Sequence, residues 1–254
     1  MANEGGMANE PESGPAAFFK AMHRSFGGIL AAGRGHAALI DAVTARAFDF
    51  FEGNVAIQAE GLPALACHKG CPACCTLRVT ASAPEIFLLA RYICRIHETP
   101  GGAQLDLPRR IAEADTITHG RDEAGRLALR SRCPMILRGV CIIHPVRPLA
   151  CRGHASFDKR ACAAAIAGRP VEVPLSEPHA MVRSLVQNAM QSALREAGYA
   201  WAEYELNHAL HMALTEEGCL AAWMEGEDVL APALAAEVDW AAMGKTFEAI
   251  LASR

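Results

Sequence analysis

Residues 66–85 have the sequence ACHKGCPACCTLRVTASAPE, which joins two kinds of local structure. The first part places four cysteines around Gly70 and Pro72, a composition that predicts irregular backbone. The last four residues, Ser82 to Glu85, form a capping-box pattern, in which the Ser and Glu side chains each satisfy a backbone amide at the start of a helix. We therefore expect an irregular cysteine-bearing segment that leads directly into a helix ending near His97.

Apolar residues at helical spacing predict further helices on both sides of this segment. Gly27-Gly28 is expected to break the helix over residues 15–32, and Gly120 the helix over residues 106–131. Residues 133–156 are rich in Pro and Gly and are expected to form a loop, after which Ser156 caps a short helix. The predicted fold class is mainly α, a helical domain with two irregular cysteine-rich loops. The long predicted helices cover residues 15–32, 36–60, 106–131, 176–196, 199–217 and 237–252.

Composition narrows the class of protein. The 254 residues are 52% hydrophobic and only 6% aromatic, so we expect one helical domain over residues 16–254. Residues 1–15 are polar and lack the pattern of a secretory signal, so we expect a disordered tail. The net charge of −4 predicts no nucleic-acid partner. No apolar stretch approaches the roughly 18 residues needed to cross a membrane, and we expect a cytoplasmic protein.

The sequence contains ten cysteines, an unusually high number. Because disulfides are rare in the reducing cytoplasm, we expect clustered cysteines there to bind metal or to take part in redox chemistry. Several thiolates gathered by irregular backbone would bind zinc or the iron of an iron–sulfur cluster. Cys94 and Cys219 stand apart, and we expect them to be buried as small hydrophobic residues. The other eight are the candidate ligands of a metal or cluster: Cys67, Cys71, Cys74, Cys75, Cys133, Cys141, Cys151 and Cys162.

Basic residues are frequent near these cysteines. Their charge would offset the negative charge of several thiolates held together. The abundance of arginine and the number of cysteines favour an iron–sulfur cluster slightly over zinc, and both are compatible with ligation by cysteine alone. The basic residues closest in sequence are Lys69, Arg78, Arg138, Arg147 and Arg152.

The two cysteine groups, in this order, resemble the YkgJ-type cysteine-cluster proteins, whose CxxCxxCC domain is described as chelating zinc or iron. The resemblance covers residues 67–162 and implies metal or iron–sulfur binding by these cysteines. It does not imply a reaction: one relative, the flagellin lysine N-methylase, is an enzyme, but the cysteine blocks alone do not transfer that activity. The first block is Cys67-x3-Cys71-x2-Cys74-Cys75, followed by Arg78 and the helix start at Ser82. The second comprises Cys133-Pro134-Met135-Ile136, Gly139-Val140-Cys141-Ile142-Ile143-His144, Arg147-Pro148, Cys151-Arg152 and Cys162.

Two histidines depart from the pattern of that family. His144 stands where the family usually has Tyr, and His154 lies where an aromatic residue often follows the Cys-Arg pair. Each could add a nitrogen ligand or change the packing, and we favour packing. The expected partner is the metal ion or cluster itself, and no protein partner or substrate is identified. Two functions stay open, a metal centre with redox or protein-modifying activity and a non-catalytic interaction module stapled by metal.

A second motif lies outside the cysteine groups. Glu205, His208 and His211 have the spacing that places three potential ligands near one helix face. A di-iron carboxylate site would need a second Glu-x-x-His on a partner helix, and the sequence offers no convincing one. We therefore expect His208 and His211 to be ordinary helix residues.

Overall fold

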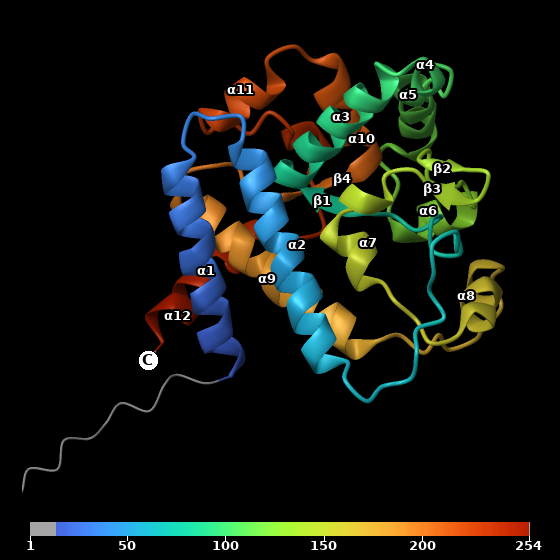
Figure 1. Ribbon diagram of the computed structural model, residues 1–254, viewed down its shortest axis with the longest axis horizontal. Helices are drawn as coiled ribbons and strands as arrows, with labels where there is room; N and C mark the ends of the chain where they lie inside the picture. Colours follow the sequence, from blue (N-terminus) through green and yellow to red (C-terminus); the bar gives the residue numbers. More distant parts are fainter. Residues whose placement is uncertain (1–13, 254) are drawn as a thin grey trace, which may run out of the picture.

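A computed structural model describes residues 14–253 and confirms a mainly α fold with little sheet (Figure 1). Of the expected disordered tail, only Gly14 and Pro15 belong to the described residues, and Pro15 is the first residue of a helix. Within residues 14–253, no helix combines the length and the apolar character that crossing a membrane requires.

Long helices form the frame of the molecule. They are α1 (Pro15–Ala32), α2 (Leu39–Gln58), α9 (Glu177–Glu196) and α12 (Trp240–Ala252). α1 packs against α2, α9 and α12, and Figure 1 shows α9 crossing behind α1 and α2. The contact faces carry fully buried side chains such as Met22, Ile40 and Val186. Apolar residues three and four positions apart line one face of each helix, which explains this packing.

The expected break at Gly27-Gly28 is wrong, because α1 continues through both glycines. Phe26 and Leu30, on either side of them, are buried against the neighbouring helices. A glycine inside a helix costs roughly 1 kcal/mol relative to alanine. The burial of these two large side chains outweighs that cost, so tertiary packing decides the course of the chain here.

Two short antiparallel strands start two further helices. β1 (Thr80–Ser82) leads into α3 (Ala83–His97), and β4 (Glu203–Glu205) leads into α10 (Leu206–Thr215). The strands pair with each other, with Thr80 opposite Glu205 and Ser82 opposite Glu203. This two-stranded ribbon of β1 and β4 therefore places the starting points of α3 and α10 side by side.

The predicted capping box at the start of α3 is confirmed. The Glu85 carboxylate accepts hydrogen bonds from the backbone amide and the hydroxyl of Ser82, at 2.9 and 2.7 Å. Its other oxygen accepts a 2.7 Å bond from the backbone amide of Leu149. This buried carboxylate thus joins the start of α3 to a segment 64 residues further along the chain.

Residues 106–131 form two helices with an interruption at Gly120, as expected. They are α5 (Leu107–Thr118) and α6 (Glu123–Leu129), and the φ of Gly120 is +69°. A short helix, α4 (Pro100–Ala103), precedes them. α5 packs against α10, so the two helices form one side of the molecule next to α3.

Residues 133–156 are not one loop, contrary to the prediction from their Pro and Gly content. They contain β2 (Ile136–Leu137), β3 (Val140–Cys141), the 3-10 helix η1 (His144–Val146) and α7 (Leu149–Gly153). The hairpin of β2 and β3 turns at Arg138-Gly139, whose φ values are +48° and +80°. Two successive positive φ values make the tight turn that matches the twist of paired strands.

The next helix, α8 (Lys159–Ile166), begins later than expected. Its cap is Asp158, whose carboxylate accepts from the backbone amides of Arg160 and Ala161 at 2.7 and 3.1 Å. Ser156 is not the cap, because its hydroxyl donates instead to the carbonyl oxygen of Pro174. The bend before α8 is therefore held by the segment that leads to α9.

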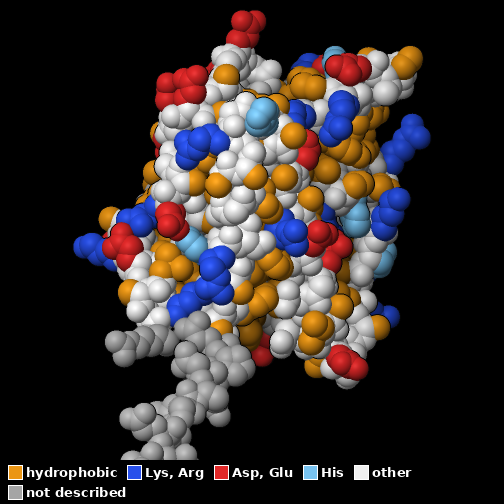
Figure 2. Space-filling view, turned by 60° about the vertical axis from the view of Figure 1, so that its left-hand side comes forward, with side chains coloured by type: hydrophobic (Ala, Val, Ile, Leu, Met, Phe, Trp, Pro, Cys, Tyr) orange, Lys and Arg blue, Asp and Glu red, His pale blue; other side chains and the backbone are white. Residues whose placement is uncertain are grey.

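The C-terminal third adds α11 (Cys219–Met224) and the 3-10 helix η2 (Ala231–Ala233). Trp223 of α11 is fully buried and stacks on Tyr199, with ring centroids 4.8 Å apart. On the face drawn in Figure 2, basic and acidic side chains are intermixed and apolar side chains lie between them. That face carries no extended surface of one charge.

Candidate functional site

The first cysteine group lies on irregular backbone between α2 and β1, as predicted. Short turns shape it: the amide of Cys71 donates to the carbonyl of His68 at 2.9 Å, and the amide of Cys75 donates to that of Pro72 at 3.2 Å. Gly70, with a φ of +90°, supplies the left-handed conformation that the first of these turns requires. Consecutive tight turns bring four thiols into a segment of nine residues, Cys67–Cys75.

The second cysteine group is distributed over several short elements rather than one loop. Cys133 precedes β2, Cys141 lies in β3, Cys151 in α7 and Cys162 in α8. The hairpin and the two short helices therefore fix these four positions. The sequence prediction missed these elements because a high Pro and Gly content is typical both of loops and of closely spaced short elements.

Backbone contacts join the two groups. The amide of Cys133 donates to the carbonyl oxygen of Cys75 at 2.6 Å. At the other end, the amide of Ser156 donates to the sulfur of Cys67 at 3.3 Å, and the amide of Ala66 donates to the carbonyl of Ser156 at 3.0 Å. In Figure 1 the segment between α2 and β1 runs past α8 toward the β2–β3 hairpin. Both ends of the first group are thus held against the second.

The neighbouring thiols of Cys74 and Cys75 differ strongly in acidity. A hydrogen bond from the Cys75 thiol and, to a smaller extent, the nearby Arg147 guanidinium lower the pKa of Cys74 to about 7. The pKa of Cys75 is raised, because its proton is held in that bond and because the side chain is partly buried. The surroundings therefore favour a thiolate at Cys74, and the thiolate is the form that binds metals.

Burial has the opposite effect on the other thiols. It raises the pKa of Cys133 to about 11, and it also raises the pKa of Cys151, Cys141 and Cys67. Repulsion between thiolates adds to this effect, and it acts across the two groups. The interacting pairs include Cys75 with Cys133 and Cys151, Cys74 with Cys141 and Cys151, and Cys67 with Cys162.

The spacing of the sulfurs distinguishes two kinds of metal site. Within residues 14–253, no three cysteine sulfurs lie within 4.8 Å of one another. Tetrahedral zinc, with Zn–S bonds of about 2.3 Å, holds its sulfurs about 3.8 Å apart. Among the described residues, no three cysteine sulfurs therefore have the spacing of a closed single-zinc site.

The basic residues near the cysteines have different partners. Arg78 forms an ion pair with Glu237, and Arg152 forms one with Glu52 at 2.5 Å. Arg147 lowers the pKa of both Cys74 and Cys141, and its Nε is buried with no hydrogen-bond partner among the described residues. Of these three arginines, Arg147 is the one whose charge acts on the thiols.

One of the two isolated cysteines departs from expectation. Cys219 is buried in the core, as predicted, but Cys94 is exposed, so that prediction is wrong. Cys94 follows the fully buried Ile93 on α3 and turns away from the core. Burial lowers the pKa of His144 and of His154, and neither belongs to a group of three close ligand atoms among the described residues.

The motif of Glu205, His208 and His211 does not assemble as a unit. Glu205 caps α10, accepting from the backbone amide of His208 at 2.9 Å. The imidazole of His208 instead faces Asp115 on α5, next to His119. Sequence reasoning missed this neighbourhood, and the signal available was the spacing of Asp115 and His119, four residues apart at the end of a predicted helix.

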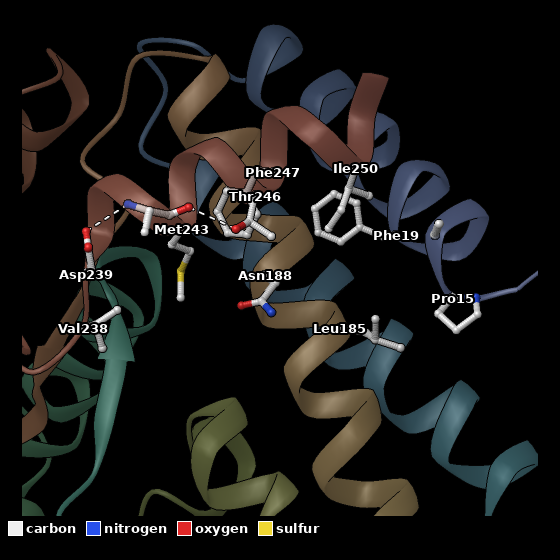
Figure 3. Close-up of a pocket in the computed structure, with 12 residues that line it drawn as sticks. Pro15, Phe19, Leu185, Asn188, Val238, Asp239, Met243, Thr246, Phe247 and Ile250 are labelled. Atoms are coloured by element: carbon white, nitrogen blue, oxygen red, sulfur yellow. Dashed lines mark hydrogen bonds between the residues drawn. The ribbon is translucent and has the colours of Figure 1, made fainter. Parts of the chain in front are cut away.

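A pocket of about 470 Å³ lies between α1, α9 and α12 (Figure 3). Its lining is mostly apolar, with Phe19, Leu185 and Phe247 among the contributors. Two of its polar side chains serve α12 itself: Asp239 accepts from the amide of Ala242, and Thr246 donates to the carbonyl of Ala242. No cysteine lines this pocket, so it is separate from the candidate metal ligands.

A serine, a histidine and a glutamate also meet between α1 and α9. Ser192 Oγ lies 3.0 Å from His23 Nδ1, and His23 Nε2 lies 2.5 Å from Glu196. Ser192 is only 3% exposed, so its hydroxyl is closed to a substrate. The arrangement resembles a hydrolase triad in composition only, and it serves to hold α1 on α9.

Comparisons with protein-family models, with curated proteins and with solved structures found no match to this chain.

Proposed function

We propose that this protein binds an iron–sulfur cluster, or alternatively zinc, through cysteines of the two groups. The observation that carries the proposal is that the two groups meet although they lie more than 50 residues apart in sequence: the amide of Cys133 donates to the carbonyl oxygen of Cys75 at 2.6 Å. Thiols brought together from distant segments without disulfide bonds are typical of metal ligands. The proposal includes kinship with the YkgJ-type proteins, whose two cysteine blocks have the same order.

The donor set suits the proposed group. Thiolates are the preferred ligands of iron–sulfur clusters, and their net negative charge requires nearby positive charge or N–H donors. Arg147 meets both requirements, since it acts on Cys74 and Cys141 and has a buried Nε without a partner among the described residues.

When bound, an iron–sulfur cluster would supply electron transfer. The residues of this chain would hold and tune it: the partial burial of Cys133 and Cys151 would limit access of water, and Arg147 would compensate the thiolate charge. Because both of these thiols have a raised pKa, binding a cation would release their protons, and its affinity would increase with pH.

Anaerobic purification followed by iron, zinc and sulfide analysis tests the proposal. We expect iron and acid-labile sulfide in stoichiometric amounts, with a broad absorption near ~400 nm that bleaches on reduction. Cys133→Ser should abolish both signals, whereas the matched control Cys94→Ser, at an exposed thiol, should leave them intact. A folded protein that contains neither metal nor sulfide would overturn the proposal.

A non-catalytic zinc module is the second candidate. It is favoured by the way the cysteines lie at the junction of distant segments, where a metal would fasten Cys67–Cys75 to the hairpin and short helices. Stoichiometric zinc without sulfide, together with unfolding on chelation, would support this candidate over an iron–sulfur protein.

A further inference from the structure

A separate group of potential metal ligands lies between α5 and α10. Asp115 is in the last turn of α5, His119 follows that helix, and His208 is in the first turn of α10. His208 Nδ1 lies 3.0 and 3.1 Å from the two carboxylate oxygens of Asp115, and His119 Nδ1 lies 3.9 Å from one of them. The two imidazole rings approach edge to face, with centroids 4.0 Å apart. Among the described residues, this is the one group of three ligand atoms within 4.8 Å.

The two helices hold this geometry firmly. Asp115 and His119 are four residues apart, so they share one face of the end of α5. Asn207, next to His208, donates a hydrogen bond to the hydroxyl of Thr118 at 3.1 Å and thereby ties α10 to α5. Glu205 caps α10 through the amide of His208. All three side chains therefore project from elements that pack directly against each other.

The distances match the size of a bound metal ion. Zinc binds imidazole nitrogen and carboxylate oxygen at about 2.0–2.2 Å, which places tetrahedral ligands about 3.3–3.6 Å from one another. His208 Nδ1 lies 3.0 and 3.1 Å from the two oxygens of Asp115 and His119 Nδ1 lies 3.9 Å from one of them, so the separations lie on both sides of that range. Two imidazoles and one carboxylate are also a donor set that zinc and other divalent transition metals prefer.

Exposure indicates how such an ion would be coordinated. The side chains of Asp115 and His208 are 11% and 18% exposed, whereas that of His119 is 52% exposed. The group is thus buried on one side and open to solvent on the other. Glu205 adds a second carboxylate in the same neighbourhood, and its Oε1 is buried with no hydrogen-bond partner among the described residues.

We propose that Asp115, His119 and His208 form a second metal site, distinct from the cysteines, which binds one divalent transition metal such as zinc. Three protein ligands leave at least one coordination position for water, the arrangement of zinc sites that act on a substrate rather than only support the fold. The proposal does not depend on the cysteine centre, because none of its ligands is a thiol.

Zinc titration of the chelator-treated full chain, followed by imidazole nitrogen NMR, tests this site directly. We expect the ring resonances of His119 and His208 to shift together and to saturate at the same zinc concentration, while those of His211 stay unchanged. His211 is the internal control, since it lies on the same helix but outside the group. Unshifted His119 and His208 resonances at saturating zinc would mean that the contact with Asp115 is only a structural ion pair.

Variants provide an independent measurement. His119→Ala removes an exposed side chain, so the fold should persist, and the zinc association constant at this site should decrease by more than about 10-fold. His211→Ala should leave it unchanged, and equal effects of the two variants would refute the site. Cobalt bound here should give a visible spectrum without the thiolate-to-cobalt charge-transfer band. A Cys133→Ser variant should retain that spectrum, so the cysteine proposal and this one can fail separately.

Discussion

At the scale of single residues, Glu85 shows how much one local signal can determine. The capping pattern of Ser82 to Glu85 is visible in the sequence, and the structure confirms it. The bond from the amide of Leu149 could not be predicted, because nothing local indicates which distant donor meets the second carboxylate oxygen. A motif read from sequence thus specified the helix start, whereas its tertiary partner depended on the packing of α7.

Glu85→Ala should destabilise the fold by about 2–4 kcal/mol, because it removes a cap and leaves the buried amide of Leu149 without an acceptor. Urea denaturation measures the free energy of unfolding. Glu113→Ala is the control, since that carboxylate is exposed and takes part only in a long ion pair with Arg109, so its effect should stay within about 0.5 kcal/mol. Equal effects of the two substitutions would contradict this role of Glu85.

Glu203 should make stability depend on pH. Burial raises its pKa above the ordinary 4.5, although a hydrogen bond from Thr80 partly opposes this. The folded state therefore binds this proton more tightly than the unfolded state, and the contribution to stability is lost as the pH rises through the folded-state pKa. Glu203→Gln, which stays neutral, should become more stable relative to the parent as the pH increases from 4.5 to neutrality. Unfolding free energies across that range test this, and a constant difference would refute it.

At the scale of elements, glycines with the same sequence signal have different surroundings. Gly28 lies on the exposed side of α1, and a Cβ atom there would meet no atom within 4 Å. Gly153 lies in α7 against α9, and a Cβ atom there would lie 2.5 Å from the Cβ of Arg183. The sequence predicted a helix break at the first and a loop at the second. Both predictions were wrong, because packing between helices, which no local pattern reveals, decides these positions.

Gly28→Ala should therefore stabilise the protein by about 0.5–1 kcal/mol, the difference in helix propensity. Gly153→Ala should destabilise it by about 1–3 kcal/mol, because α7 must move away from α9. Thermal unfolding of the two variants gives both signs. If the cysteines bind metal as proposed, the second variant should also contain less of it, since α7 carries Cys151. Stabilisation by Gly153→Ala would show that the close approach of α7 and α9 is relaxed in solution.

At the scale of the whole molecule, the sequence predicted the long helices well and the region between them poorly. The helices α1, α2, α9 and α12 have long apolar faces, which give a strong periodic signal. The β2–β3 hairpin and α7 are each too short for such a signal, whereas the short helix α8 was predicted but with a start two residues too early. The candidate thiols could be chosen from their spacing, but the group of Asp115, His119 and His208 depends on the packing of α5 against α10 and was missed.

Removing the proposed cysteine-bound metal should loosen one part of the molecule only. Hydrogen exchange should increase in residues 64–79 and 131–168, where the metal would join distant segments. Exchange should remain slow in α1 and α9, whose mutual contact is made by buried apolar side chains. Mass spectrometry before and after chelation measures this. Equal acceleration along the whole chain would mean that the metal supports the entire fold, as expected for a zinc-stapled module.

The pairing of β1 with β4 has a consequence for the protein during its synthesis. Thr80 and Glu203, which contact each other across the ribbon, are 123 residues apart. At translation rates of about 5–20 residues per second, roughly 6–25 seconds pass between the appearance of one strand and that of its partner. During that interval β1, which directly follows Cys67–Cys75, has no β4 to pair with. Loading of a cofactor on the ribosome would therefore meet an unfinished site, and assembly is expected to follow release of the chain.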